Sequence, residues 1–511
     1  MATWIYIIGY VGMTLSLGIW FFLKEKKRPA LQLQRAFWIT TALYALGVII
    51  NYAPIDYKMQ STFRDLMVLA GSGVVLALVF RLRKSMAIVL GLWIIAFLWY
   101  MKDNLINTYP DYTPPASIEL DEQGELLIEI KEGRSISDVS DLLEKYSLEA
   151  DLAFNPADKA STILDNYYVV DVPANNVRKL SQIMKAFEKH PALEWIEPNE
   201  VIQISPVETT KLPRKIEQKY GVNDPGIENL WGFEAMQMDK LYNYLRANNI
   251  SPKKESMIAI IDTGVDSDHE DLKDNYTSIN SKYDQDVFGH GTHCAGIAGA
   301  VTNNGVGIAS YAPNNDFVQI TSVRVMNAGG FGTQKTIVSG MIEAVDKGAD
   351  VLSMSLGGRA HQSKQRAYNK AVQYANDKGS IVVTSAGNSN DNANKFTPAN
   401  SDGVIVVSAI DSELKRAFFS NHISDVKMGI TAPGVEIYST KPNNTYLAHN
   451  GTSMSCPYVS GIIGMMKAIK PEINTQEAYK ILNETGKNIK DTPKTGRLIQ
   501  PYDAIKKLME N

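Results

Sequence analysis

The sequence predicts an α/β protein whose largest domain is a mostly parallel sheet with helices on both faces. Three observations lead to this prediction. In the second half of the 511-residue chain, short apolar runs alternate with stretches of helical periodicity. A β-α-β-β-α-β pattern, typical of a ferredoxin-like α+β domain, comes before that half. Charge-free apolar runs nearer the N-terminus predict about four transmembrane helices.

Length and composition divide the chain further. A chain of 511 residues is too long for one ordinary domain. The formal net charge of −4 gives no reason to expect a nucleic-acid partner. We predict a transmembrane module, a linker, an α+β domain, a charged linker and the main domain, in that order. Their ranges are residues 1–102, 103–116, 117–206, 207–222 and 223–511.

The transmembrane module is predicted from four apolar runs without charged residues. They cover residues 3–23, 36–53, 66–80 and 85–101. A membrane span needs roughly 17–25 residues. The third run is shorter than this, so three spans are the alternative to four.

The positions of basic residues predict how this module is oriented. Lysine and arginine cluster between the first and second runs and between the third and fourth, which puts both loops in the cytoplasm. Because the basic cluster follows the first run, we expect an uncleaved span there and not a signal peptide. The protein would then be a multi-pass protein of the cell membrane, in contact with the lipid bilayer. The chain after Lys102 would be extracytoplasmic.

The α+β domain is predicted from its strand-like runs and the helical patterns between them. Residues 125–131 and 167–172 are the clearest strands, and residues 193–204 close the domain. A weaker strand lies near residues 152–154. A helical pattern follows the first strand, and a second one with the same spacing follows residues 167–172.

The main domain alternates strand-like runs with helical patterns, which indicates a parallel sheet covered on both faces. Such sheets place functional residues where strands end and helices begin. The predicted strands are 257–262, 317–325, 351–355, 381–385 and 404–409, and the clearest helices are 333–347 and 363–377.

Three stretches of the main domain carry groups suited to nucleophilic catalysis. Asp262 ends a buried strand in MIAIIDTGVD, where an acid needs a partner, and His290 lies in the glycine-flanked turn GHGTHCAG. Ser453, in NGTSMSCPYVSG, begins a helical pattern, where unpaired N–H groups favour negative charge. An ordinary N-cap serine is the alternative for Ser453. A serine nucleophile needs a base and an acid, and the three residues supply this set.

These motifs resemble those of the subtilisin-like serine peptidases, the subtilases, in their order and spacing. The resemblance implies a serine endopeptidase, a hydrolase in which Ser453 attacks the scissile carbonyl, His290 acts as the base and Asp262 orients the imidazole. It also implies that Asn388, in SAGNS, holds the oxyanion together with the backbone N–H of Ser453.

Two glycine-containing segments are similar to those that bind an extended substrate in this family. Pairing with a peptide backbone needs strand edges without bulky side chains, which explains the glycines. The expected partner is a peptide or protein substrate. The implied substrate-binding residues are Ser355, Leu356, Gly357, Gly330 and Gly332.

The α+β domain resembles the inhibitory propeptides of the family, most clearly in LEWIEPNEVIQI. The resemblance implies a zymogen, in which this domain is an intramolecular inhibitor until the chain is cut. We expect the cut between about Ile204 and Asn223 without naming the bond. It would separate the peptidase from its membrane anchor, leaving either release or noncovalent retention. A generic ferredoxin-like domain is the alternative.

The resemblance also bears on metals and on the two cysteines. Asp271 and Asn304 match family positions that contribute to a structural Ca²⁺ site, although members vary there, so a site without calcium stays open. Catalysis itself would require no cofactor.

Cys294 and Cys456 each follow a candidate catalytic residue by about one helical turn. We expect two buried thiols, with a disulfide as the alternative.

Two other functions remain as alternatives. A catalytically silent membrane scaffold could use the fold to bind peptides, although no member of the Asp, His and Ser set is missing. A sensor or transporter regulated by the peptidase is the other alternative. The apolar runs contain no Asp, Glu, Lys, Arg or His, so they offer little for an ion or proton path.

Overall fold

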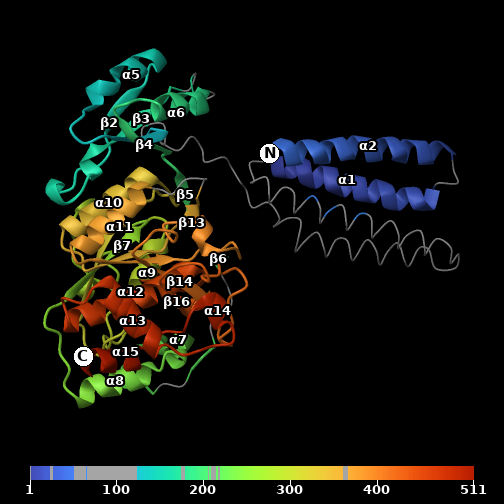
Figure 1. Cartoon of the computed structure of the whole chain (residues 1–511). Helices are drawn as coiled ribbons and strands as arrows, with labels where there is room; N and C mark the ends of the chain where they lie inside the picture. The colour runs from blue at the N-terminus through green and yellow to red at the C-terminus, as the bar shows by residue number, and fades with distance from the viewer. Residues whose placement is uncertain are drawn as a thin grey trace. The chain divides into compact units, whose positions relative to one another are not determined.

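A computed structural model of the chain describes two N-terminal helices and most of the chain after residue 124 (Figure 1). It divides into two compact units, Met1–Glu119 and Leu120–Asn511. The described residues are 2–23, 27–50, 62, 65, 69, 124–173, 176, 179–204, 207–208, 214–216, 219–360 and 366–510.

The first unit contains two helices that pack against each other, α1 (Ala2–Leu23) and α2 (Lys27–Ile50). The first predicted span falls in α1, and most of the second falls in α2. Within the part of the chain that the structure describes, no helix is long and apolar enough to cross a membrane. The third predicted span, apart from Leu69, and the whole fourth span lie outside the described residues.

A buried polar cluster surrounds Asp65 in this unit. The carboxylate of Asp65 accepts hydrogen bonds from the hydroxyl groups of Tyr6 and Tyr44, and its backbone carbonyl accepts one from Tyr10. All four side chains are buried. A buried carboxylate requires such donors, because burial without them is costly. Asp65 lies one residue before the third apolar run, so the sequence pattern had placed it outside the predicted spans.

The second unit begins with the predicted α+β region. Its four strands are antiparallel neighbours in the order β2-β3-β1-β4. Alternate residues of β1 face different cores: Leu126 and Ile128 face the helices of this region, whereas Leu127 faces the main domain. The elements are β1 (Leu126–Ile130), α5 (Ser140–Tyr146), β2 (Glu149–Leu152), β3 (Tyr167–Asp171), α6 (Leu180–Glu188) and β4 (Leu193–Pro198).

A six-stranded sheet in the order β15-β14-β12-β10-β7-β8 forms the centre of the main domain, and all neighbouring strands are parallel. Five of these strands were predicted to within about two residues. The sixth, β15, was missed because its sequence GITAP contains both glycine and proline. The strands are β7 (Ser256–Asp262), β8 (Val318–Arg324), β10 (Val351–Met354), β12 (Ile381–Ser385), β14 (Val404–Ile410) and β15 (Gly429–Pro433).

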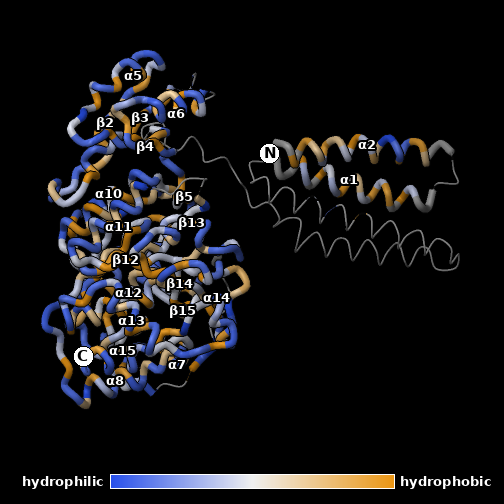
Figure 2. Tube along the Cα trace, viewed as in Figure 1, coloured by the Kyte–Doolittle hydropathy of each residue, from blue (hydrophilic) through white to orange (hydrophobic). Residues whose placement is uncertain are grey.

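Helices cover both faces of this sheet, as predicted. Residues of α9 (His290–Gly299) and α12 (Thr452–Ile469) share one core with Ile258 and Ile260 of β7. Residues of α10 (Gln334–Asp346) and α11 (Arg366–Asp377) share another with Ala259 and Ile261, which alternate with them along the strand. In Figure 2 the trace around β12 is hydrophobic, as expected for a strand buried on both faces.

Several shorter elements surround or connect these layers. The helices among them are α7 (Trp231–Ala235), α8 (Met238–Ala247), α13 (Thr475–Thr485), α14 (Thr492–Thr495) and α15 (Pro501–Glu510). The strands among them are β5 (Val201–Gln203), β6 (Val207–Glu208), β9 (Phe331–Thr333), β11 (Gly358–Arg359), β13 (Phe396–Thr397), β16 (Ile437–Lys441) and β17 (Thr445–Asn450).

Candidate active site

Asp262 and His290 form a buried pair at the carboxyl end of β7. His290 is the first residue of α9. Its Nδ1 lies 2.8 Å from Oδ1 and 2.9 Å from Oδ2 of Asp262, and neither side chain is exposed to solvent. The backbone N–H of Thr263 donates a further hydrogen bond of 2.8 Å to Oδ1 of Asp262. With Nδ1 held by the carboxylate, Nε2 is the ring atom of His290 that can exchange a proton with another group.

The pKa of His290 is raised well above its usual value. Burial alone would lower this pKa, but the charge and hydrogen bond of Asp262, together with the neighbouring Cys294, more than offset that effect. Protonation of His290 therefore adds to the free energy of unfolding. This stabilisation is complete at a pH below about 6.5, the pKa of histidine in the unfolded chain, and it is lost as the pH rises through the raised pKa of the folded protein. A base must be unprotonated, so catalysis that depends on His290 should increase through the same pH range.

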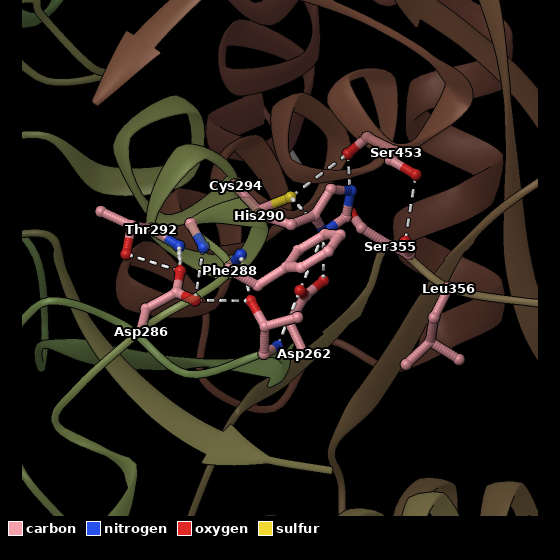
Figure 3. A network of polar contacts seen from close by, with 12 residues as sticks. Asp262, Asp286, Phe288, His290, Thr292, Cys294, Ser355, Leu356 and Ser453 are labelled. Atoms are coloured by element: carbon pink, nitrogen blue, oxygen red, sulfur yellow. Dashed lines mark hydrogen bonds and ion pairs between the residues drawn. The ribbon is translucent and has the colours of Figure 1, made fainter. Parts of the chain in front are cut away.

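Ser453 lies in the first turn of α12, next to His290 (Figure 3). Its hydroxyl donates a hydrogen bond of 3.0 Å to the carbonyl oxygen of Ser355, and the Ser355 hydroxyl donates one of 2.7 Å to the carbonyl oxygen of Ser453. Nε2 of His290 is buried and has no hydrogen-bond partner among the described residues. The structure therefore joins Asp262 to His290 but not His290 to Ser453, because the serine hydroxyl is turned toward Ser355.

Asn388 follows β12 and is held beside the first turn of α12. Its Oδ1 accepts hydrogen bonds from the backbone N–H of Thr452 at 2.9 Å and from the Thr452 hydroxyl at 2.8 Å. Thr452 directly precedes Ser453. Because these contacts fix the oxygen side of the amide, the Nδ2 donor of Asn388 is directed away from Thr452.

Asp286 is a buried carboxylate near the site that the sequence analysis missed. Its Oδ1 accepts hydrogen bonds from the Thr263 hydroxyl at 2.8 Å and from the backbone N–H of Gly289 at 2.7 Å. Its Oδ2 accepts two from Thr292, one from the backbone N–H at 2.9 Å and one from the hydroxyl at 2.8 Å (Figure 3). Four neutral donors thus satisfy this carboxylate, and the side chain of Asp286 is only 6% exposed.

The partners of Asp286 connect the two halves of the buried pair. Thr263 follows Asp262 directly, and Thr292 lies two residues after His290 in the first turn of α9. Asp286 therefore fixes the start of that helix relative to the end of β7. The only sequence feature that could have pointed to Asp286 is its position four residues before His290. Acidic residues are common at such positions in surface loops, so this feature does not identify a buried carboxylate.

The predicted glycines Gly330 and Gly332 lie against the tail of the α+β region. β5 pairs antiparallel with β9, with Ile202 opposite Gly332, and the backbone N–H of Ile204 donates a hydrogen bond of 2.8 Å to the carbonyl of Gly330. A Cβ atom at Gly330, which has a φ of +76°, would lie 2.9 Å from the ring of Phe288. Glycine is therefore required for this close approach.

The other predicted segment, Ser355 to Gly357, follows β10. Leu356 is buried, and a Cβ atom at Gly357 would lie 2.8 Å from the carbonyl oxygen of Thr397. A Cβ atom at the next residue, Gly358, would lie 3.3 Å from Cγ1 of Ile202. Because Ile202 also pairs with β9, β5 lies between the two predicted substrate-binding segments.

Asp271 and Asn304, the predicted calcium ligands, are in contact. The Asn304 side-chain amide donates a hydrogen bond of 2.9 Å to Oδ1 of Asp271, and the backbone N–H of Ile308 donates one of 2.8 Å to Oδ2. Burial raises the pKa of Asp271 to about 8, and the nearby charge of Asp224 adds to the shift. Asp224, which the sequence analysis did not select, accepts a hydrogen bond of 3.1 Å from the backbone N–H of Asn304.

Cys294 and Cys456 are both buried free thiols, so the predicted state is confirmed and the disulfide alternative is wrong. Sγ of Cys294 lies 4.0 Å from Nδ1 of His290 and 3.5 Å from the carbonyl oxygen of Ser453. The thiol thus fills space between the two chain segments that carry these residues. Burial raises the pKa of Cys294, which keeps it in the neutral form.

The chain is similar to known serine proteases. The Subtilase family, Peptidase_S8, matches residues 253–497. The chain is 32% identical over 393 residues to a thermophilic serine proteinase of a Bacillus strain, covering 75% of this chain and 87% of that protein. It is 42% identical over 253 residues to thermitase of Thermoactinomyces vulgaris, covering 48% of this chain and 85% of thermitase. A solved protease structure from Pseudoalteromonas arctica aligns at 26% identity with a TM-score of 0.49, covering 56% of this chain and 99% of that chain.

The family match and the two curated relatives place this chain among the serine proteases. The chain belongs to the subtilase family and is a subtilisin-like serine protease.

We expect Asp286→Asn to lower kcat and to shift the pH dependence of kcat/KM. The asparagine NH₂ group would face the hydrogen-bond donors of Thr292 or Thr263, so at least one of these hydrogen bonds would be lost. The start of α9 would then be held less firmly against β7, which would loosen the contact between Asp262 and His290. The raised pKa of His290 would then fall, so the acid limb of the profile should move to lower pH while kcat drops about tenfold or more. The measurement is kcat/KM for a chromogenic peptide between pH 5 and 9.

The matched control is Asp284→Asn, because among the described residues the Asp284 side chain accepts hydrogen bonds only from the hydroxyl groups of Tyr276 and Ser278. It should leave the acid limb in place. A lower kcat for Asp286→Asn with an unmoved acid limb would contradict the positioning role, since partial unfolding alone produces that result.

Proposed function

We propose that this protease hydrolyses peptide bonds with Ser453 as nucleophile, His290 as base and Asp262 as the group that orients the imidazole. Oγ of Ser453 attacks the scissile carbonyl carbon while Nε2 of His290 takes the hydroxyl proton. The C–N bond then breaks, and His290 gives that proton to the leaving amine. A water molecule, activated by the same Nε2, hydrolyses the ester and regenerates Ser453.

The observation that carries this proposal is the buried pair of Asp262 and His290 next to Ser453. Nε2 of His290 has no hydrogen-bond partner among the described residues. Rotation about χ1 of Ser453 would exchange its contact with Ser355 for one with Nε2. Hydrogen bonds of this kind are often absent before substrate binds and form in the complex. The charge of Asp262 contributes both to the raised pKa of His290 and to stabilisation of the imidazolium.

The oxyanion would be held by two donors, Nδ2 of Asn388 and the backbone N–H of Ser453. The oxygen of the Asn388 amide is already fixed by Thr452, which orients Nδ2 before substrate arrives. The N–H of Ser453 lies in the first turn of α12, where N–H groups lack helical partners. Donors fixed in advance stabilise developing charge without the cost of reorganisation.

We expect Ser453→Ala to abolish peptide hydrolysis while leaving the fold intact. The expected loss in kcat is on the order of 10⁶, a magnitude established for subtilisin, which is a member of the same family. The assay is hydrolysis of a chromogenic peptide, with circular dichroism to check the fold. Ser455→Ala is the matched control, because Ser455 lies in the same helix. Within the part of the chain that the structure describes, its hydroxyl bonds only the carbonyl oxygens of Ala432 and Pro433. Turnover by Ser453→Ala equal to that of the wild type would exclude this serine as the nucleophile.

Inhibition by the α+β region is part of the proposal. Glu197, which is 1% exposed, accepts hydrogen bonds from the backbone N–H groups of Arg366 at 2.8 Å and Ala367 at 3.1 Å, at the start of α11. Asn199 accepts one of 2.9 Å from the backbone N–H of Lys335, at the start of α10. These contacts dock the region on two helix N-termini, where unpaired donors and the helix dipole favour acceptors.

The docked region would inhibit because its tail takes the place of a substrate. β5 pairs with β9 in the antiparallel manner expected of a bound peptide. A substrate that requires the same edge of β9 could not bind while β5 is there. The inhibitor would therefore compete directly with substrate, without any change in the catalytic residues.

A structural calcium ion is also proposed, at the loop that contains Asn304. Two carboxylates, Asp271 and Asp224, contact this loop. Among the described residues, none of their hydrogen-bond donors is a cationic side chain. A Cβ atom at Gly307 would lie 2.1 Å from Oδ2 of Asp271, so the loop folds tightly over the carboxylate. Carboxylate and amide oxygens are the ligands that Ca²⁺ prefers, and an ion there would offset the buried negative charge.

We expect removal of calcium to lower the melting temperature of the Ser453→Ala protein, which cannot digest itself. At a free ion concentration 100 times the Kd, binding would stabilise the fold by about 2.7 kcal/mol. The measurement is calorimetry in EDTA and after calcium is restored. Asp271→Asn should lose this difference, whereas Asp268→Asn, at an exposed position, should keep it. An identical melting temperature with and without calcium in the Ser453→Ala protein would contradict the proposal.

We further propose that the N-terminal region anchors the precursor in the cell membrane with the peptidase outside the cytoplasm. The support is the set of charge-free runs in residues 1–102 and the basic residues between them. We expect full-length Ser453→Ala protein to stay with membranes after alkaline carbonate extraction, and a chain reduced to residues 117–511 to be extracted. Full-length protein in the carbonate supernatant would exclude an integral membrane anchor.

A further inference from the structure

The loop that carries Asn388 is bonded to one buried side chain, that of Asn421, which follows β14 in the chain. Oδ1 of Asn421 accepts hydrogen bonds from the backbone N–H groups of Ser389 at 3.0 Å and Asp391 at 2.9 Å. Its Nδ2 donates one of 2.8 Å to the carbonyl oxygen of Ala386. The Asn421 side chain therefore bonds the loop both before and after Asn388.

The backbone of Asn421 adds a contact with the residue directly before Asn388. Its N–H donates a hydrogen bond of 2.9 Å to the carbonyl oxygen of Gly387. Gly387 has a φ of +95°, and a Cβ atom there would lie 2.6 Å from Nδ2 of Asn421. Glycine is required where the backbone adopts this conformation and an amide lies so close. Both chain neighbours of Asn388 are thus bonded to Asn421.

Asn421 is itself fixed to the end of β14 through Ser420. Neither residue is exposed to solvent. The Ser420 hydroxyl accepts a hydrogen bond of 3.0 Å from the backbone N–H of Ala409 in β14 and donates one of 3.1 Å to the carbonyl oxygen of Asn421. Burying an amide is costly unless its polar atoms have partners, and the loop supplies three of them to the Asn421 side chain. The position of the loop relative to the sheet therefore depends on Asn421.

Thr452 holds the Asn388 amide, whereas Asn421 holds the backbone from which that amide extends. The N–H and the hydroxyl of Thr452 both donate to Oδ1 of Asn388, and the hydroxyl oxygen accepts a hydrogen bond of 3.1 Å from the N–H of Gly387. An oxyanion donor must lie about 2.7–3.1 Å from the position of the developing charge, so a small shift of the backbone weakens it. Contacts that hold the loop therefore matter for the donor as well as contacts with the side chain.

We propose that Asn421 is a positioning residue for the oxyanion, which holds the Asn388 loop so that Nδ2 of Asn388 lies within hydrogen-bond distance of the carbonyl oxygen under attack. This inference rests on the proposed function, in which Asn388 donates to the oxyanion. Asn421 acts through Asn388 and makes no contact with the substrate. Because the charge on the oxygen develops only as the bond to Ser453 forms, loss of the Asn421 side chain should lower kcat more than it raises KM.

The test is a double-mutant cycle of Asn388→Ala and Asn421→Ala, measured by hydrolysis of a chromogenic peptide. Active enzyme is counted by titration with a serine-reactive sulfonyl fluoride, so unfolded protein does not enter kcat. Asn388→Ala should lower kcat by about 10²–10³, the loss established for the oxyanion asparagine of subtilisin, a member of the same family. Asn421→Ala should lower kcat about tenfold or more and change KM by less than about threefold. Added to Asn388→Ala, it should lower kcat by less than about twofold, because the donor that it positions is gone.

Equal losses of kcat from Asn421→Ala in the wild-type and Asn388→Ala proteins would overturn the proposal, since the residue would then act independently of Asn388. An unchanged kcat for Asn421→Ala beside the expected loss for Asn388→Ala would overturn it too and leave the proposed function standing. A wild-type kcat for Asn388→Ala would overturn the oxyanion role of that residue, and the positioning role with it.

A second variant, Asn421→Asp, tests the same role with less disturbance of the fold. It is nearly the same size and keeps an acceptor for Ser389 and Asp391, but it replaces the Nδ2 donor to Ala386 with an oxygen. The probe is a peptide aldehyde, which forms a tetrahedral adduct with the Ser453 hydroxyl and so resembles the transition state. Its inhibition constant should rise about tenfold or more, whereas KM for the matching substrate should change by less than about threefold.

The matched control is Asn376→Asp, which makes the same change beside the opposite end of β14. Nδ2 of Asn376 donates a hydrogen bond of 3.0 Å to the carbonyl oxygen of Gly403, and its Oδ1 accepts one of 2.5 Å from the Thr475 hydroxyl. This variant should lose stability but keep kcat and the inhibition constant within about twofold of the wild type. Equal inhibition constants for Asn421→Asp and Asn376→Asp would overturn the proposal, because the effect would then not depend on the Asn388 loop.

Discussion

A carboxylate buried at the end of a central strand is the constraint on which the rest of the site depends. The Asp262 side chain is fully buried, and a buried charge costs several kcal/mol unless donors surround it. The N–H of Thr263 and Nδ1 of His290 supply those donors. His290 reaches the carboxylate because α9 begins at that point, and Asp286 fixes where α9 begins. The position of His290 thus follows from the need of the buried Asp262 carboxylate for hydrogen-bond donors.

A second constraint, the unpaired N–H groups at helix starts, connects catalysis with the proposed inhibition. Four helices that flank the sheet begin with N–H groups that have no acceptor within the helix, and side-chain oxygens from other elements accept hydrogen bonds from them. Asp286 accepts a hydrogen bond from the first turn of α9, and Asn388 accepts one from the first turn of α12. Both contacts lie beside the candidate catalytic residues. Asn199 accepts a hydrogen bond from the start of α10, and Glu197 accepts one from the start of α11. Both residues belong to the α+β region. The same chemical requirement therefore shapes the candidate active site and holds the α+β region on the main domain.

The sequence predicted the features that depend on local patterns. Continuous apolar runs such as the one ending at Asp262 predicted five of the six sheet strands, because strands buried on both faces need them. The segments carrying Asp262, His290 and Ser453 could be selected because each ends a strand or starts a helix. β15 was missed, since its burial depends on neighbours that the short sequence GITAP does not reveal.

Features that depend on contacts between distant segments could not be predicted in this way. Asp286 and Asp224 look like ordinary loop acids until folding brings them to Thr263 and Asn304. The pairing of β6 with β17 joins residues more than two hundred positions apart, and neither strand has a pattern that identifies its partner. The orientation of the Ser453 hydroxyl toward Ser355 is a choice of rotamer, which no sequence pattern specifies.

The most direct test of this account is to label the processed enzyme with a serine-reactive sulfonyl fluoride and to locate the adduct by mass spectrometry. The account predicts one adduct per chain, on Ser453, with loss of peptidase activity in proportion to labelling. It also predicts that labelling becomes faster as pH rises through the pKa of His290, because the base must lose its proton. Complete loss of activity with the adduct on another residue, or full activity with Ser453 labelled, would contradict the central claim.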